Sequence, residues 1–439
     1  MRNTCLLLLQ LMALSGFAQQ EIRTYYDESE TLLKEVYQTI GSETNLQGPY
    51  KKFYPNGQLS TEGSFENGYK NGEFKEYYQD GSLQRIINFK NGLKNGPVKV
   101  YNDDGFLIQI AYFKENKLAD SLLIYYDQGA LRSRAFFVND KPDGILYEYY
   151  PDGVTKREIT YHLGEQTGIT KTFYESGLLS TEGNYLNGIL NGYYNTYYTN
   201  GKLDTSSEMD KGTKTGEYKH YDSLGNLLLI GHYKNGLLDG ENIGYYTTGT
   251  LKHRFNYLAG KLVGTNVHYY PSGLKEKEIV TAKDGISQTI SFYNTQGMLT
   301  KIENYQNELP NGTWTYFNDE GIKTKSEPYE MGRINGSIFI YHPNGSIKEE
   351  IPIKYDVKYG ELKTYFDNGE LESVTPFRND KRHGTYFRYN INNTIVETGE
   401  YVGNRKVGNW KFYNDNGELT KTEVYQVGKL VETKIATQD

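Results

Sequence analysis

The sequence is poor in the residues that build thick globular cores or disulfide frameworks. Its 439 residues include one cysteine and two tryptophans, and hydrophobic residues make up only 37%. Ordinary globular domains contain about 45–50% apolar residues, glycine included. The composition therefore argues against the two to four thick-cored domains that this length would ordinarily suggest.

Positive charge and long apolar runs are also lacking. The 48 lysines and arginines are outnumbered by 55 aspartates and glutamates, a net charge of −7. This balance argues against a nucleic-acid partner, because the phosphate backbone selects basic surfaces. Beyond the first twenty residues, no stretch is apolar enough to predict a transmembrane helix.

The N-terminal segment has the pattern of a secretory signal peptide. Arg2 supplies a positive start, residues 5–14 form a short apolar run, and Gly16 and Ala18 are small residues before the expected cut. We predict cleavage after Ala18 and a secreted or periplasmic location. The single cysteine, Cys5, lies inside this segment, so the mature chain is expected to have no disulfides and no thiol chemistry.

Tyrosine and glycine are abundant and recur with a fixed spacing. The chain contains 43 Tyr and 47 Gly. In steps of 24 residues from Gly48 to Gly408, glycine occupies fourteen of sixteen positions, the exceptions being Asp120 and Gln288. We call this position 0 of each repeat and number the others from it. Such self-similarity at a fixed period is typical of repeat architectures.

Each repeat reads as a β-hairpin with two turns. Positions 1–6 and 11–17 are rich in strand-forming residues, and positions 9 and 20 carry Gly, Asn or Asp, which tolerate positive φ. At position 9 the one residue other than glycine is Asn393, which this preference for positive φ predicts, and at position 20 only Glu308 departs from it. The sequence predicts an all-β fold, an elongated and twisted antiparallel β-meander or solenoid of about 16 tandem 24-residue β-hairpin repeats.

We predict four segments along the chain. Residues 1–18 form the signal peptide, residues 19–47 a degenerate N-terminal capping repeat, residues 48–431 the sixteen repeats, and residues 432–439 a polar C-terminal tail. Caps are expected because an open sheet exposes unpaired edges.

Position 5 is aromatic in every repeat, which predicts a structural stripe on the packed face. We expect the aromatic residues of position 17 to join it there, and glycines at position 15 to make room for a ring from the next strand. The position-5 residues are Phe53, Tyr77, Tyr101, Tyr125, Tyr149, Phe173, Tyr197, Tyr221, Tyr245, Tyr269, Tyr293, Phe317, Tyr341, Tyr365, Tyr389 and Tyr413.

Position 6 differs between the two ends of the array. It is tyrosine in eight of the first ten repeats and is replaced by Asn, His or Phe in the last six. The stripe could be structural, could be a contact surface for a protein or glycan, or could mediate self-association. Its members are Tyr54, Tyr78, Tyr126, Tyr150, Tyr174, Tyr198, Tyr246 and Tyr270.

The segments FRNDKRHGTYFRYN at 377–390, YKNGLLDGENIGYY at 233–246 and EGSFENG at 62–68 resemble the MORN repeat. The pattern is most similar to the bacterial MORN-variant group, which is often labelled antitoxin-like. The resemblance covers residues 48–431 and implies a repeat fold with roles in protein binding, scaffolding or membrane association.

No residues break the repeat in a way that predicts catalysis. The seven histidines have no spacing typical of a metal site, and no nucleophile motif is present. We therefore predict no catalytic, cofactor-binding or metal-binding residues, and a non-catalytic interaction or scaffolding role. Two alternatives remain open: an antitoxin or immunity protein that neutralises a toxin, and an enzyme that processes an envelope polysaccharide or peptide.

Overall fold

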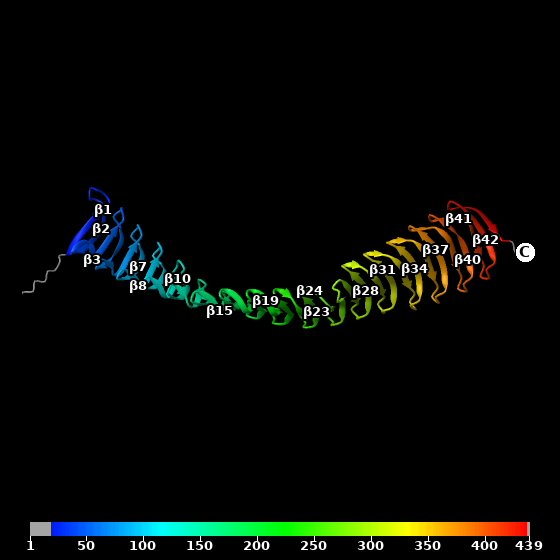
Figure 1. Ribbon diagram of the computed structural model, residues 1–439, viewed down its shortest axis with the longest axis horizontal. Helices are drawn as coiled ribbons and strands as arrows, with labels where there is room; N and C mark the ends of the chain where they lie inside the picture. The colour runs from blue at the N-terminus through cyan, green and yellow to red at the C-terminus, as the bar shows by residue number, and fades with distance from the viewer. Residues whose placement is uncertain (1–18, 437–439) are drawn as a thin grey trace, which may run out of the picture. The chain divides into compact units, whose positions relative to one another are not determined.

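The computed structural model describes residues 19–436, which form strands and turns with no helix among them. The signal peptide predicted for residues 1–18 lies outside the described residues. The chain divides into two units, Met1–Thr213 and Lys214–Asp439. Within each unit, antiparallel hairpins follow one another in chain order (Figure 1). The predicted all-β meander of hairpin repeats is confirmed.

In the first unit the strands are β1 Gln19–Tyr25, β2 Leu33–Ile40, β3 Ser42–Phe53, β4 Leu59–Glu66, β5 Tyr69–Lys70, β6 Gly72–Tyr77, β7 Leu83–Lys90, β8 Leu93–Tyr101, β9 Leu107–Lys114, β10 Lys117–Tyr125, β11 Leu131–Val138, β12 Lys141–Pro142, β13 Gly144–Tyr149, β14 Thr155–His162, β15 Glu165–Phe173, β16 Leu179–Leu186, β17 Ile189–Tyr197 and β18 Leu203–Asp210.

From the junction onward they are β19 Thr213–Tyr221, β20 Leu227–Lys234, β21 Leu237–Leu238, β22 Gly240–Tyr245, β23 Leu251–Leu258, β24 Lys261–Leu262, β25 Thr265–Tyr269, β26 Lys275–Thr281, β27 Ser287–Tyr293, β28 Leu299–Gln306, β29 Leu309–Pro310, β30 Gly312–Phe317, β31 Lys323–Glu330, β32 Arg333–Ile334, β33 Gly336–Tyr341, β34 Ile347–Lys354, β35 Val357–Lys358, β36 Gly360–Tyr365, β37 Leu371–Arg378, β38 Lys381–Arg382, β39 Gly384–Tyr389, β40 Ile395–Val402, β41 Arg405–Tyr413, β42 Leu419–Gln426 and β43 Lys429–Ile435.

Both turns of a repeat need left-handed backbone, as the sequence predicts. At position 9, Gly57 has φ of +82°, and Asn393 takes the same region at +61°. The second turn has two left-handed residues, such as Asn67 at +52° and Gly68 at +80°. Two successive positive φ values define the type I′ turn, whose twist matches that of the flanking strands. Glu308 adopts the same conformation with φ of +65°.

The repeated glycine at position 0 forms a β-bulge. Gly192 has φ of +107°, and the pairing of β16 with β17 shifts register around it, between Leu190 and Tyr194. The two exceptions behave differently. Asp120 keeps the bulge conformation with φ of +74°, whereas the hairpin of β26 and β27, which contains Gln288, pairs without a register shift. The sequence locates these glycines but does not predict the bulge.

The register assigns each position to one face of the sheet. In the first repeat, Gly48 pairs with Phe65, Tyr50 with Gly63, and Lys52 with Thr61. Even positions 2 and 4 therefore share a face with odd positions 13, 15 and 17, because paired residues point the same way. We call this the core face. Positions 1, 3, 5, 14 and 16 lie on the other side, which we call the second face.

This assignment corrects the predicted packing of the aromatic stripes. Positions 5 and 17 lie on opposite faces, since position 17 pairs with position 0 while position 5 pairs with position 11, as in Phe53 and Leu59. None of the sixteen position-5 rings is fully buried. Position 17 instead packs against position 2: the ring centroids of Phe65 and Phe74 lie 5.6 Å apart.

The most buried side chains lie at positions 2 and 15 of the core face. Phe74 and Trp410, both at position 2, are 1% and 0% exposed. Glycines at position 15 make room for such rings, as predicted. A Cβ at Gly63 would lie 2.6 Å from the ring of Phe74, and one at Gly399 would lie 2.1 Å from the ring of Trp410. At Gly231 the neighbour is the side chain of Asn242 and no ring.

At both ends the sheet includes residues that lie outside the sixteen repeats. The residues 19–47 contain β1, β2 and the start of β3, and Tyr37 pairs with Tyr50. At the other end, Glu432–Ile435 belong to β43, which pairs with β42. The predicted tail of 432–439 is therefore too long, because main-chain hydrogen bonding needs no apolar side chain. Residues 437–439 lie outside the described residues.

Candidate functional site

The position-6 tyrosines connect consecutive repeats through their hydroxyl groups. Each hydroxyl crosses the start of the second strand and donates a hydrogen bond to the position-5 carbonyl of the next repeat. Seven such bonds, 2.6–3.0 Å long, run from Tyr54, Tyr78, Tyr126, Tyr150, Tyr174, Tyr246 and Tyr270. The eighth tyrosine of the row, Tyr198, lies shortly before the junction between the two units. These tyrosines are half-buried, so the predicted contact stripe also has a structural role.

Asparagine at position 6 makes a different connection. The Oδ1 of Asn318 accepts hydrogen bonds from the main-chain N–H groups of Glu320 and Ile322, at 3.1 and 2.8 Å. The side chain thus stabilises its own turn, as Asn commonly does. His342 keeps the tyrosine-like connection, since its Nε2 lies 2.9 Å from the carbonyl of Tyr365.

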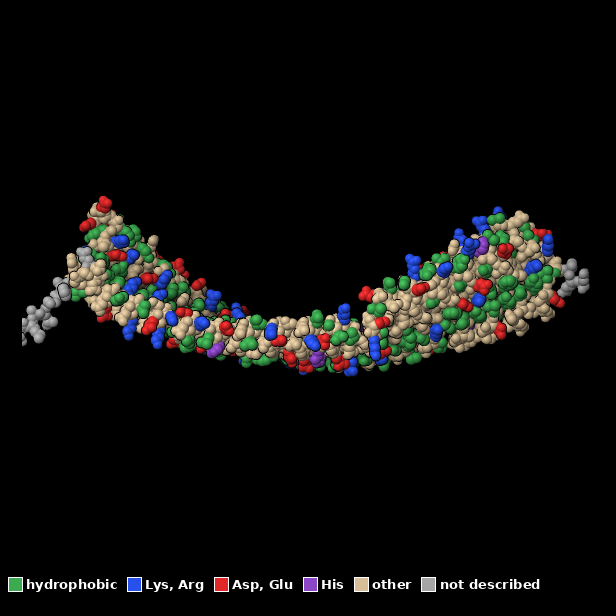
Figure 2. Space-filling view, viewed as in Figure 1, with side chains coloured by type: hydrophobic (Ala, Val, Ile, Leu, Met, Phe, Trp, Pro, Cys, Tyr) green, Lys and Arg blue, Asp and Glu red, His purple; other side chains and the backbone are tan. Residues whose placement is uncertain are grey.

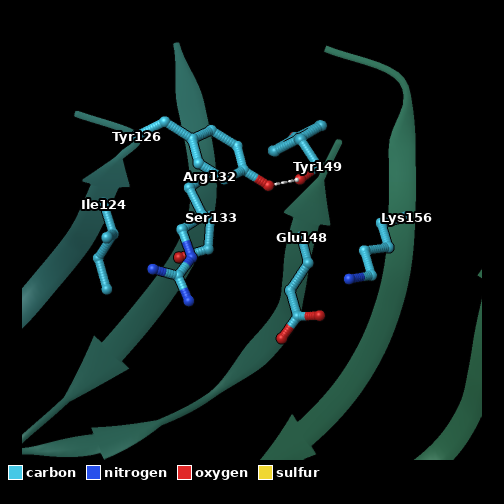
Figure 3. A pocket seen from close by; sticks show the side chains of 7 residues that line it. All are labelled: Ile124, Tyr126, Arg132, Ser133, Glu148, Tyr149 and Lys156. Carbon is cyan, nitrogen blue, oxygen red and sulfur yellow. Dashed lines mark hydrogen bonds between the residues drawn. The ribbon is translucent and has the colours of Figure 1, made fainter. Parts of the chain in front are cut away.

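A hollow of about 350 Å³ lies on the core face beside this row, between repeats 4 and 5 (Figure 3). Its wall consists of Ile124, Tyr126, Arg132, Ser133, Glu148, Tyr149 and Lys156. Figure 3 shows Tyr126 closing one end through its bond to the carbonyl of Tyr149, with the charged side chains below it. An aromatic ring, two cations and one carboxylate therefore share one open surface.

The two cations of this hollow have few competing partners. Arg132 and Lys156 are exposed and lie 5.9 and 5.5 Å from the ring centroids of Tyr126 and Tyr150. Glu148 is paired with Arg157, whose Nη1 is 3.5 Å from the carboxylate. Among residues 19–436, neither Arg132 nor Lys156 forms an ion pair with an acidic side chain, so both are available to an anionic or hydroxyl-rich group.

An equivalent hollow of about 510 Å³ recurs between repeats 13 and 14. Its walls again come from positions 4, 5, 6, 12 and 13 and their neighbours, here His342, Lys348, Glu349, Thr364, Tyr365, Phe366, Asp367 and Glu372. The repeat geometry therefore builds the same kind of surface at different places, while the side chains vary its charge. Lys, Arg, Asp and Glu are interspersed on the visible surface of each unit (Figure 2).

Buried carboxylates occupy the core face of repeats 11 and 12. Glu303 and Glu327, at position 15, are 8% and 6% exposed. Glu327 accepts hydrogen bonds from the hydroxyls of Tyr316 and Tyr329, at 2.9 and 3.3 Å, and pairs with Lys325. These partners hold the pKa of Glu327 below its ordinary value, although burial alone would raise it.

The tyrosines beside these carboxylates are shifted in the opposite direction. Burial and the neighbouring Glu327 raise the pKa of Tyr329 to about 12, and burial with Glu303 raises the pKa of Tyr305 to about 12. Because both tyrosines stay protonated, their hydroxyls remain donors to the carboxylates. Every polar group in the cluster has a partner within the chain, so we assign the cluster a structural role.

Two histidines face each other across adjacent strands. His253 on β23 pairs in register with His268 on β25. The ring centroid of Phe255 lies 4.4 Å from that of His253 and 4.8 Å from that of His268. Burial lowers the pKa of both imidazoles. Among residues 19–436, no group of three His, Cys, Asp or Glu side chains could hold a metal ion, and no helix could cross a membrane.

Comparison with known families identifies the repeat. The profile of the MORN repeat variant matches residues 46–67, 70–91, 142–162, 214–235, 334–355, 358–379 and 406–426. Every match begins two residues before a position 0, within the frame that the structure shows. The chain belongs to the MORN-variant repeat proteins. These repeats indicate an interaction or scaffolding module.

Solved structures with a match to this MORN-variant protein are much longer chains. A TcdB2–TccC3 structure without its hypervariable C-terminal region shows 11% identity over 89% of this chain and 24% of that chain, with a TM-score of 0.16. A Tc holotoxin pore from Photorhabdus luminescens shows 13% identity over 89% and 24%, with a TM-score of 0.15. TcdB2–TccC3–Cdc42 shows 11% identity over 96% and 31%, with a TM-score of 0.13.

This MORN-variant chain spans about a quarter to a third of those solved chains, and TM-scores this low support no inference from them. A search of curated proteins found no match.

Sequence reasoning found the position-6 row but missed two features of its surroundings. The charged residues at position 12 vary from repeat to repeat, so no period in the sequence points to Arg132 and Lys156. The repeat pattern alone does not mark Glu303 and Glu327 as buried. The signal that could have found them is tyrosine two residues later, at Tyr305 and Tyr329, because i and i+2 residues share a face.

Proposed function

We propose that this MORN-variant protein is a secreted or periplasmic, non-catalytic module that holds a protein or glycan partner along the position-6 row. The supporting observation is the recurrence of an open hollow at equivalent repeat positions, in repeats 4–5 and 13–14. Surfaces that recur along a repeat array suit an extended partner better than a small compact substrate.

The chemistry of the hollow in repeats 4–5 favours a partner that carries hydroxyl or carboxylate groups. Tyr126 presents a half-buried ring whose hydroxyl is already bonded, while Arg132 and Lys156 present exposed cations. Aromatic rings provide flat apolar contact, and a guanidinium can bind a carboxylate through two hydrogen bonds. Acidic glycans and acidic polypeptide segments both offer these groups.

A binding screen with matched variants tests this proposal. Full-length protein is incubated with arrays of acidic glycans and acidic peptides, and each hit is measured by biolayer interferometry. Arg132→Ser with Lys156→Ser should weaken affinity at least tenfold, which corresponds to about 1.4 kcal/mol. Lys90→Ser, an exposed cation at a strand end, serves as the control. Unchanged affinity in the double variant would exclude this hollow as the contact.

Location and the absence of catalysis need separate measurements. N-terminal sequencing of protein recovered from the cell envelope or medium should begin at Gln19. A cytoplasmic protein that begins at Met1 would refute the secreted location. Incubation with each bound polymer should leave the polymer intact by mass spectrometry. Reproducible cleavage would replace the binding function with an enzymatic one.

A further inference from the structure

An exposed apolar row lies on the second face of the first unit. Phe136, Ile145, Ile169 and Tyr193 come from β11, β13, β15 and β17, and their exposed fractions are 46%, 43%, 43% and 36%. Phe136 occupies position 16 of repeat 4, and the others occupy position 1 of repeats 5, 6 and 7. Since these positions share a face, the four side chains form one row across neighbouring strands.

The row is a local feature and no general property of the fold. In repeats 8, 9 and 14, position 1 is Glu217, Glu241 and Glu361. Beside the apolar row, a hollow of about 280 Å³ is lined by residues that include Leu123, Phe136, Ile145 and Tyr147. An apolar patch with polar surroundings is typical of a protein-binding surface.

Polar groups between the apolar residues are already hydrogen-bonded. The hydroxyl of Thr160 donates to the carbonyl of Ile169 at 2.7 Å, and the Nδ2 of Asn184 donates to the carbonyl of Asn191 at 2.9 Å. Covering the row would therefore bury few unsatisfied groups, which lowers the free-energy cost of association.

We propose that a second copy of this chain covers the row, in a two-fold symmetric dimer formed by the second faces of repeats 4–7. Ile145, Ile169 and Tyr193 recur on alternate strands, about 9.6 Å apart, and a second copy has the same spacing. From β10 to β17, seven full-length strands offer about 34 Å by 20 Å, roughly 700 Å² per copy. Two such surfaces reach the range of stable interfaces, about 1,200–2,000 Å² in total.

The charges beside the row fit a two-fold axis that runs along β14. Such an axis exchanges strands at equal distances on either side, so Ile145 faces Ile169 of the second copy. It also places Arg134 opposite Glu182 of the second copy. Arg134 stacks on Tyr147 at 4.4 Å and forms no ion pair in the described chain, while Glu182 has a 3.7 Å pair with Lys171. The charge of Arg134 is therefore left for an intermolecular partner.

Sedimentation equilibrium of the full chain tests the dimer. Wild type should be dimeric at micromolar concentration, and Ile145→Asp with Ile169→Asp should weaken dimerisation at least a hundredfold with an unchanged circular dichroism spectrum. Leu186→Asp is the control, because Leu186 is 53% exposed and lies at the hairpin end outside the row. A monomeric wild type, or a double variant that remains dimeric, would overturn the proposal.

A charge exchange tests the orientation of the two copies. Arg134→Glu alone and Glu182→Arg alone should each weaken dimerisation about tenfold, because each brings like charges together. The combined variant should restore it. If the combined variant is weaker than both single ones, the axis along β14 is wrong. The Arg132 and Lys156 variants of the core face should leave dimerisation unchanged, which separates this interface from the binding hollow.

Discussion

Repeats 1–10 and repeats 11–16 share one backbone but join their neighbours differently. In the first group, position-6 tyrosines bond to the next repeat, as Tyr150 does to the carbonyl of Phe173 at 2.9 Å. In the second group, asparagines such as Asn318 bond to their own turn. Repeats 11 and 12 of the second group also bury a carboxylate on the core face, and Glu327 accepts hydrogen bonds from two tyrosine hydroxyls of its own repeat.

The comparison shows which parts of the repeat are interchangeable. The type I′ turn, the position-9 turn and most position-0 bulges persist in both groups. The position-6 connection between repeats is lost at Asn318 but kept at His342, which still reaches the carbonyl of Tyr365. The carboxylate bonds of the core face lie within one repeat and do not replace it. A repeat array tolerates such local differences because each repeat contacts only its neighbours.

The largest expected effect comes from changing the residue at position 15 together with the position-2 residue that it faces in the next repeat. Gly399 of repeat 15 faces Trp410 of repeat 16, whereas Ile159 of repeat 5 faces Thr170 of repeat 6. Gly399→Val should destabilise the C-terminal repeats by about 3 kcal/mol, since the new side chain overlaps the indole. Urea unfolding followed by circular dichroism measures the loss, because this signal does not depend on Trp410. Gly399→Val with Trp410→Thr, which imitates repeat 5, should recover most of it, and failure to recover would show that ring overlap is not the cause.

A smaller effect is expected when the carboxylate of repeat 12 is replaced by the aliphatic side chain of repeat 5. Glu327→Ile leaves the hydroxyls of Tyr316 and Tyr329 without their acceptor, so we expect a loss of about 2 kcal/mol. Hydrogen exchange of the amides in β30 and β31 measures it. Adding Tyr316→Phe should reduce the loss. Glu320→Ile, at an exposed turn position, should change stability by less than about 0.5 kcal/mol.

The sequence predicts the architecture well because the architecture depends on backbone conformation. Glycine and asparagine at fixed spacing reveal the turns, and Asn393 was correctly predicted to replace a turn glycine. The face assignment failed for position 5, which lies on the second face while position 17 lies on the core face, because the offset between paired strands depends on the turn bulge and cannot be read from alternation alone. The buried Phe74 and Trp410 were not predicted either, because position 2 is aromatic in only seven of the sixteen repeats.

The pH dependence of stability should also differ between repeats 11–12 and repeats 4–5. The folded pKa values of Tyr305 and Tyr329 are raised to about 12, so the unfolded chain loses their protons first as pH rises. Their contribution is complete below the ordinary tyrosine pKa of about 10 and is lost between there and pH 12. For Glu327 the folded pKa is lowered, so its contribution is lost on acidification, below its ordinary value of 4.5.

Hydrogen exchange at several pH values can resolve these losses by repeat. Amides of repeats 11 and 12 should lose protection above pH 10 before those of repeats 4 and 5. In Glu327→Gln the acid-side loss in repeat 12 should disappear. Equal alkaline loss in repeats 11–12 and repeats 4–5 would mean that the buried tyrosine–glutamate pairs do not set the difference.

The smallest expected effect concerns the position-6 bonds themselves. Tyr150→Phe keeps the ring and removes only the bond to the carbonyl of Phe173, so it should cost about 1 kcal/mol. Because that bond joins two repeats, amide exchange should accelerate in both repeat 5 and repeat 6. Tyr69→Phe is the control, since Tyr69 is 62% exposed.

Asn318→Ala provides the opposite case. Its side chain bonds only to the turn of repeat 12, so exchange should accelerate at Glu320 and Ile322 and remain unchanged in repeat 13. If both variants affected one repeat alone, the tyrosine bonds would contribute nothing to cohesion between repeats. The position-6 tyrosines would then not stabilise the contact between repeats. Their presence in the first ten repeats would favour their role as a contact surface for a partner.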